Sequence, residues 1–193
     1  MTELEYQRQA AELKDACIRL IPQLADKAPS VRLLEHAHSL LRSGLVVEPT
    51  KRNDGVPRYL FCGGEWNDQA DTGWPWCAAY VCWLHRMALV PIVANAKNER
   101  LLWECAAMWR CAVGLGVTEP AGVVPGLGWT MFLHGRGCSD RLTGTGIHHV
   151  GVVSAIDGGR FCCIEGNAGN RLAEVWHNCS DNNLAGFARF VAA

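Results

Sequence analysis

The 193-residue sequence lacks several features that would place it in a common functional class. It has no excess of basic residues, because 18 Lys and Arg face 19 Asp and Glu for a formal net charge of −1. Phosphate binding needs clustered positive charge, so we expect no nucleic-acid partner. The sequence also has no apolar run near 18 residues and no basic, apolar leader at Met1. We therefore expect no membrane span and synthesis in the cytoplasm without a signal peptide.

Metal-binding patterns are missing too. The ten cysteines include no C-x-x-C pair, and the seven histidines have no spacing that complements a cysteine pair. We therefore expect no metal and no other cofactor. An even number of cysteines is compatible with a disulfide framework. However, the cysteines lie in apolar segments where a thiol packs as a small hydrophobe, so free thiols are favoured.

The order of helical and strand patterns predicts an α+β fold. Apolar steps of four and three over residues 6–24 predict a first helix, and a second begins at Pro29-Ser30 with Ser30 as N-cap. It should end near Gly44. We therefore divide the chain into a helical extension over residues 1–44, which packs on the core, and a core domain over residues 45–193.

Within the core domain, residues 46–73 carry loop signals, whereas residues 75–87 and 98–113 predict helices, the former apolar on nearly all sides. A turn at Asp157-Gly158-Gly159 should join two strands. The short β-rich runs lie at residues 129–133, 147–156, 160–164, 171–177 and 187–191.

Cys77 is the candidate nucleophile. It lies two residues after Pro75, in the first turn of the predicted buried helix. Unpaired N–H groups and the helix dipole favour a thiolate there. The flanking Trp74 and Trp76 would wall a substrate cleft. From this segment alone, a core cysteine like Cys82 is an equally good interpretation.

His149 is the candidate base because its strand is otherwise apolar and the next strand leads to Glu165 and Asn167. A three-residue hairpin loop over residues 157–159 would pair 149 with 167 and 151 with 165. The three polar side chains would then share one face, whereas a two-residue loop would separate them. His148 would point to the opposite face.

These residue types suit thiol catalysis of amide cleavage. His149 would deprotonate Cys77 or share an ion pair with it, and then protonate the leaving amine. Either Glu165 or Asn167 would hold the imidazole in its working tautomer. Backbone N–H groups at the helix start would form an oxyanion hole with a side-chain donor, for which Asn67 and Gln69 are the candidates.

Three motifs together resemble the CHAP family of cysteine, histidine-dependent amidohydrolases and peptidases, which are relatives of the NlpC-type cell-wall hydrolases. In chain order they are Trp-Cys77-Ala-Ala-Tyr-Val, His149-Val-Gly-Val-Val and Ile-Glu165-Gly-Asn167. The resemblance covers residues 45–191. It implies a papain-like core with a helix-borne cysteine packed on a small antiparallel sheet.

The resemblance also implies a substrate. Such enzymes are cysteine peptidases or amidases that cleave peptidoglycan, as an N-acetylmuramoyl-L-alanine amidase or as an endopeptidase of the stem peptide or cross-bridge. Action at the cell wall or periplasm would need secretion machinery, and an inhibitor protein is a further expected partner. The sequence departs from the family at Pro125-Gly126, because Leu127 follows where such domains often carry Asp.

Two other functions fit the same residues. A cysteine amidase, deamidase or acyl transferase could act on a cytoplasmic amide or peptide substrate, since the sequence shows no export signal. A non-catalytic module of the same fold would carry an unreactive Cys77.

Overall fold

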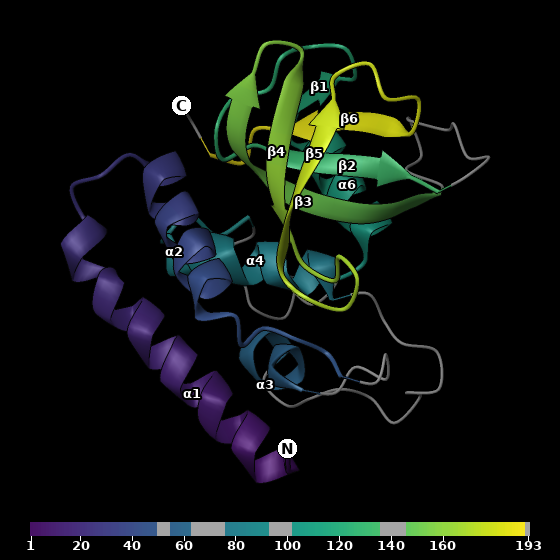
Figure 1. Ribbon diagram of the computed structural model, residues 1–193. Coiled ribbons are helices and arrows are strands. Elements are labelled where there is room, and N and C mark those ends of the chain that lie inside the picture. Colours follow the sequence, from purple (N-terminus) through teal and green to yellow (C-terminus); the bar gives the residue numbers. More distant parts are fainter. Residues whose placement is uncertain (50–54, 63–75, 93–101, 136–145, 192–193) are drawn as a thin grey trace.

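The computed structural model describes residues 1–49, 55–62, 76–92, 102–135 and 146–191. It has an α+β fold in which helices precede a six-stranded antiparallel sheet of order β1-β6-β2-β3-β4-β5 (Figure 1). The general α+β prediction is confirmed. Of the ten cysteines, Cys138 lies outside the described residues, and the other nine are thiols.

The N-terminal helices are α1 (Glu3–Leu20), the 3-10 turn η1 (Pro22–Leu24) and α2 (Pro29–Ser43). The prediction of one helix through residue 24 is wrong, because Pro22 lacks an N–H and cannot continue α1. Ser30 is not the N-cap of α2. Ala28 occupies that position and Pro29 takes the first helical turn, where no N–H is needed. The predicted end is confirmed, since Gly44 caps α2 with φ 65°.

The described part of the core domain contains the helices α3 (Val56–Cys62), α4 (Cys77–Met87) and α6 (Cys105–Gly114). The interpretation of residues 46–73 as loop is wrong over α3. There Pro57 lies in the first turn, and apolar side chains pack against α1 and α4. The helix predicted from residue 98 begins only at Cys105, because residues 102–104 form a turn and bend. Residues 98–101 of the predicted helix lie outside the described residues.

The sheet consists of β1 (Thr118–Pro120), β2 (Thr130–His134), β3 (Ile147–Asp157), β4 (Arg160–Glu165), β5 (Ala173–Asn178) and β6 (Leu184–Ala188). The last strand begins earlier than predicted because Gly186 belongs to it, at φ 151°. A Cβ at Gly186 would collide with the carbonyl oxygen of Glu119 on the neighbouring strand. A glycine that looks like a strand breaker in the sequence therefore permits close strand pairing.

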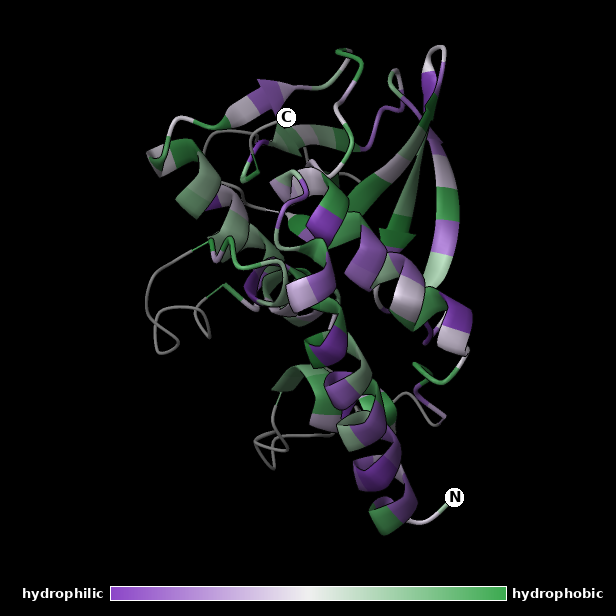
Figure 2. Ribbon diagram, turned by 90° about the vertical axis from the view of Figure 1, so that its left-hand side faces the viewer, coloured by the Kyte–Doolittle hydropathy of each residue, from purple (hydrophilic) through white to green (hydrophobic). Residues whose placement is uncertain are grey.

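The hydrophobic core lies between the helices and one face of the sheet. Helix α4 runs beneath the sheet and packs against β3, and α2 packs on α4 (Figure 1). Leu33 and Leu40 of α2 share one buried cluster with Tyr80 of α4 and Val150 of β3. The outward side of α1 is mostly hydrophilic (Figure 2). The N-terminal helices therefore cover α3 and α4 and complete the core.

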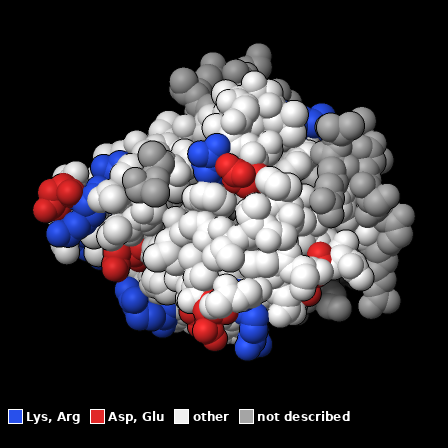
Figure 3. All heavy atoms as spheres, turned by 90° about the horizontal axis from the view of Figure 1, so that it is seen from above, with Lys and Arg blue, Asp and Glu red and all other residues white. Residues whose placement is uncertain are grey.

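The described surface shows no concentration of one charge sign on the face seen from above the sheet, where Lys and Arg alternate with Asp and Glu among uncharged residues (Figure 3). No described helix is long and apolar enough to cross a membrane. Among the same residues, no group of three or more His, Cys, Asp or Glu is arranged to hold a metal ion.

Candidate active site

Cys77 is the first residue of α4, and its position is set by the residue before it. Trp76 is the N-cap and is 1% exposed. Its indole N–H donates to the buried Glu48 carboxylate at 3.0 Å, and its ring stacks on Phe61 with centroids 5.6 Å apart. A Cβ on Gly166 would come within 2.8 Å of the Trp76 ring, so only glycine lets the turn after β4 lie this close. The start of α4 is thereby fixed against the end of β4.

The β3–β4 hairpin pairs Gly151 with Glu165 as predicted, although its loop is shorter than the predicted one. Asp157 pairs with Arg160, so the loop has two residues, and the three-residue loop is wrong. A β-bulge between Val153 and Ala155 then shifts the register by one residue. As a result Gly151 lies opposite Glu165, as predicted. The bulge compensates for the short loop and returns Glu165 to the face of His149.

His149 and Glu165 form a direct hydrogen bond. Nε2 of His149 lies 2.7 Å from Oε2 of Glu165, and the two side chains are 16% and 4% exposed. The Cys77 sulfur is within hydrogen-bonding reach of the same imidazole. Because Glu165 engages Nε2, Nδ1 is the ring nitrogen left for the sulfur. The structure therefore brings together a thiol, an imidazole and a carboxylate in that order.

The electrostatics of this group favour a charged pair. The hydrogen bond from Cys105 and the hydrogen bond and charge of His149 hold the pKa of the Cys77 thiol well below its ordinary value, against the effect of burial. Burial also opposes an imidazolium, but the contacts with Cys77 and Glu165 outweigh it and raise the pKa of His149 to about 10. At neutral pH these directions favour a thiolate beside an imidazolium.

His177 is a member of the site that the sequence analysis left without a role. Its Nε2 lies 2.6 Å from Oε1 of Glu165. Its ring stacks on that of Phe161 in β4, with centroids 5.4 Å apart. Burial opposes ionisation of Glu165, but the hydrogen bonds of His149 and His177 lower its pKa. Strand alternation contained the signal, because His177 shares the inward face of β5 with Ala173 and Val175.

Cys105 is the second residue that sequence reasoning missed. Its sulfur lies 3.5 Å from that of Cys77, and both side chains are buried. Cys105 is the first residue of α6, so two helix N-termini meet at the sulfur pair. Contact with Cys77 and burial raise the pKa of the Cys105 thiol well above its ordinary value. Cys105 was not expected at a helix N-terminus, because the helix was predicted to begin at residue 98.

The other predicted site residues lie elsewhere. Asn167 lies beyond β4, in a turn with φ 61°, so the predicted pairing of 149 with 167 is wrong and Glu165 alone holds the imidazole among the two candidates. Trp76 belongs to the core and not to a solvent-facing wall. His148 is exposed, as predicted for the opposite face. Trp74, Asn67 and Gln69 lie outside the described residues.

Gly151 supplies the space that Glu165 occupies. A Cβ at Gly151 would lie 2.7 Å from Cγ of Glu165 and 3.2 Å from Cβ of Cys163. We expect Gly151→Ala to push the carboxylate off His149 and to destabilise the fold by about 1–3 kcal/mol. Denaturant unfolding and the activity assay below measure the two effects.

Gly159→Ala is the matched control for Gly151→Ala, because a Cβ at Gly159 of the same hairpin meets nothing within 4 Å. This control should unfold at nearly the wild-type denaturant concentration and keep its activity. Equal stability and activity in Gly151→Ala would show that Glu165 does not depend on the space above Gly151.

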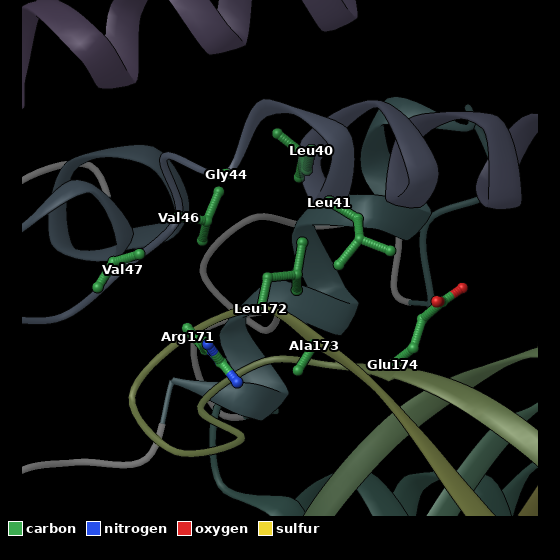
Figure 4. Close-up of a pocket in the computed structure, with 9 residues that line it drawn as sticks. All are labelled: Leu40, Leu41, Gly44, Val46, Val47, Arg171, Leu172, Ala173 and Glu174. Atoms are coloured by element: carbon green, nitrogen blue, oxygen red, sulfur yellow. The ribbon is translucent and has the colours of Figure 1, made fainter.

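A separate hollow of about 460 Å³ lies away from this group, where the end of α2 meets the start of β5 (Figure 4). Leu40, Leu41 and Gly44 line one side. Val46 to Val47 and the segment from Arg171 to Glu174 line the other. Its walls belong to both the N-terminal helices and the core domain, and they include none of the residues around Cys77.

Comparison of the chain with protein-family models, with curated proteins and with solved structures gave no match.

Proposed function

We propose that this protein is a cysteine amidohydrolase or peptidase with a papain-like core. One observation carries the proposal: a single imidazole, on His149, lies between the Cys77 sulfur and the Glu165 carboxylate, with 2.7 Å between Nε2 and Oε2. A nucleophile, a base and a group that orients the base are the three parts that thiol catalysis of acyl transfer requires. Here they come from α4, β3 and β4.

The reaction follows from the positions of these groups. The Cys77 thiolate attacks the acyl carbon, and the negative charge on oxygen faces the first turn of α4, whose N–H groups have no helical acceptors. The His149 imidazolium protonates the departing amine, which leaves a thioester on Cys77. Neutral His149 then takes a proton from water as the water attacks, and the thiolate is released. Glu165 keeps its hydrogen bond to Nε2 throughout.

Burial of Cys77 sets a condition on this mechanism. Cys77 is 0% exposed, whereas the His149 side chain is 16% exposed. An acyl carbon reaches the sulfur only after the side chains that cover it have moved. Substrate binding and access to the nucleophile are therefore coupled.

The proposed substrate is an amide bond of peptidoglycan, either the muramoyl–alanine bond or one within the peptide. The support is the ordered set of motifs around Cys77, His149 and Glu165, whose three chemical groups are also in contact in the fold.

Digestion of purified sacculi tests both parts of the proposal. We expect the protein to release stem peptides or muropeptides, identified by mass spectrometry, from sacculi of at least one wall chemotype, and Cys77→Ala to release none. No release from any chemotype would refute the peptidoglycan substrate. Cleavage of a soluble peptide or amide library without release from sacculi would retain the thiol chemistry and assign a different amide.

A further inference from the structure

Two cysteine sulfurs meet at the centre of the site. Cys77 begins α4 and Cys105 begins α6, 28 positions later, and their Sγ atoms are 3.5 Å apart. A disulfide needs about 2.05 Å between sulfurs, so closing the bond requires an approach of only about 1.5 Å. Both helices also pack against β3, which holds the two N-termini together.

The two thiols have different roles. The two Sγ atoms lie 3.5 Å apart, and Cys77 is the one that also contacts the His149 imidazole. The nucleophilic partner is therefore Cys77, and the neutral thiol is Cys105. A reactive thiolate beside a second thiol is the arrangement in which oxidation of the first sulfur is followed by disulfide formation.

We propose that Cys77 and Cys105 form a redox-active dithiol, a modification site for hydrogen peroxide that closes reversibly to a disulfide. That closure stops amide hydrolysis rests on the proposed function, because it removes the thiolate that attacks the substrate. Closure itself depends only on the sulfur geometry.

The two steps balance without another reagent. The Cys77 thiolate attacks one oxygen of hydrogen peroxide, the O–O bond breaks, and the products are a sulfenic acid and hydroxide, which takes a proton to become water. The Cys105 sulfur then attacks the Cys77 sulfur, loses its proton, and displaces hydroxide, which leaves as a second water. Overall two thiols lose two electrons and two protons, and peroxide is reduced to two waters.

Burial selects the size of the oxidant. Cys77 and Cys105 are 0% and 4% exposed, so bulky oxidants are hindered and a molecule near the size of water enters most readily. Burial also favours the second step, because Cys105 is already in contact with the sulfur that becomes oxidised. We therefore expect the disulfide to form faster than further oxidation of Cys77.

Peptide mass mapping under non-reducing conditions tests the proposal on the full chain. After treatment with hydrogen peroxide, we expect a cross-linked peptide pair containing Cys77 and Cys105, which dithiothreitol separates again with full recovery of both thiols. Cys105→Ala should instead carry Cys77 to sulfinic acid, which dithiothreitol does not reverse. Cys111→Ala, which removes a more exposed thiol of the same helix, should form the cross-link like the wild type.

Irreversible sulfinic acid on Cys77 of the wild type, in the same proportion as in Cys105→Ala, would overturn the proposal. So would a cross-link from Cys77 to any other cysteine. The wild-type map decides the question even if Cys105→Ala does not fold. Because the cross-link is detected without an activity assay, a failure of the dithiol is distinguishable from a failure of the proposed hydrolase function.

Discussion

Cys77→Ser should lower amide hydrolysis on the order of 10³ to 10⁶-fold while leaving the fold intact. Serine is nearly the size of cysteine, and the imidazole of His149 and the neighbouring backbone of Val150 offer its hydroxyl partners. The hydroxyl stays protonated where the thiol ionises, since the surroundings of Cys77 lower a thiol pKa that is already far below that of an alcohol. Muropeptide release from sacculi measures the loss, and circular dichroism checks the fold.

Cys82→Ser is the matched control for this variant. Cys82 lies in the same helix, five residues further on, and is also buried. It introduces the same buried hydroxyl without touching the proposed nucleophile, so activity should remain within a few-fold of the wild type. If Cys77→Ser and Cys82→Ser lost activity equally, the loss at Cys77 would reflect packing and not chemistry.

His149→Ala should reduce turnover by about 10² to 10⁴-fold and move the ionisation of Cys77 to higher pH. The imidazole supplies the proton for the leaving amine and, through its hydrogen bond and charge, part of the lowering of the Cys77 pKa. The Cys105 hydrogen bond remains in this variant, so the pKa of Cys77 should rise only part of the way to its ordinary value. Difference absorbance of the thiolate against Cys77→Ser measures it without a reagent that must enter the site.

The pH dependence has a defined sign. The pKa of His149 is raised from about 6.5 to about 10, so its contribution to folding stability is complete below pH 6.5 and is lost as the pH rises through 10. Activity should fall over the same upper range, because neutral His149 cannot protonate the amine. The pKa of Cys77 is lowered, so activity should persist at a pH well below that at which an ordinary thiol ionises.

His148→Ala is the matched control for His149→Ala. His148 is the preceding residue of β3, and it is exposed on the opposite face with its Nδ1 near the carbonyl of Leu133. Its replacement should leave the thiolate absorbance curve and the turnover nearly unchanged. Full activity in His149→Ala, or an equal shift in both variants, would exclude His149 as the base.

The pairing of His149 with Glu165 shows how a correct result can follow from compensating features. Alternation along β3 and β4 predicted that His149, Glu165 and Asn167 share a face. Gly151 does lie opposite Glu165, as that register required, but Asn167 lies in a turn beyond β4. The loop is one residue shorter than expected, and the bulge at Ser154 restores the register. A bulge depends on how strands twist and pack, so local sequence carries little sign of it.

Local chemistry determined most of the helices and strands and the residue types of the site, although α3 and β1 were not predicted. The sequence alone placed Cys77 at the start of a buried helix, His149 on a strand and Glu165 at the end of the next, because helix and strand periods and turn residues act over a few positions. Only the tertiary structure decided the partners. It chose Glu165 over Asn167, added His177, and brought Cys105 to the nucleophile. These contacts join residues far apart in the chain, and they depend on a bulge and on the docking of two helix N-termini, which no local pattern encodes.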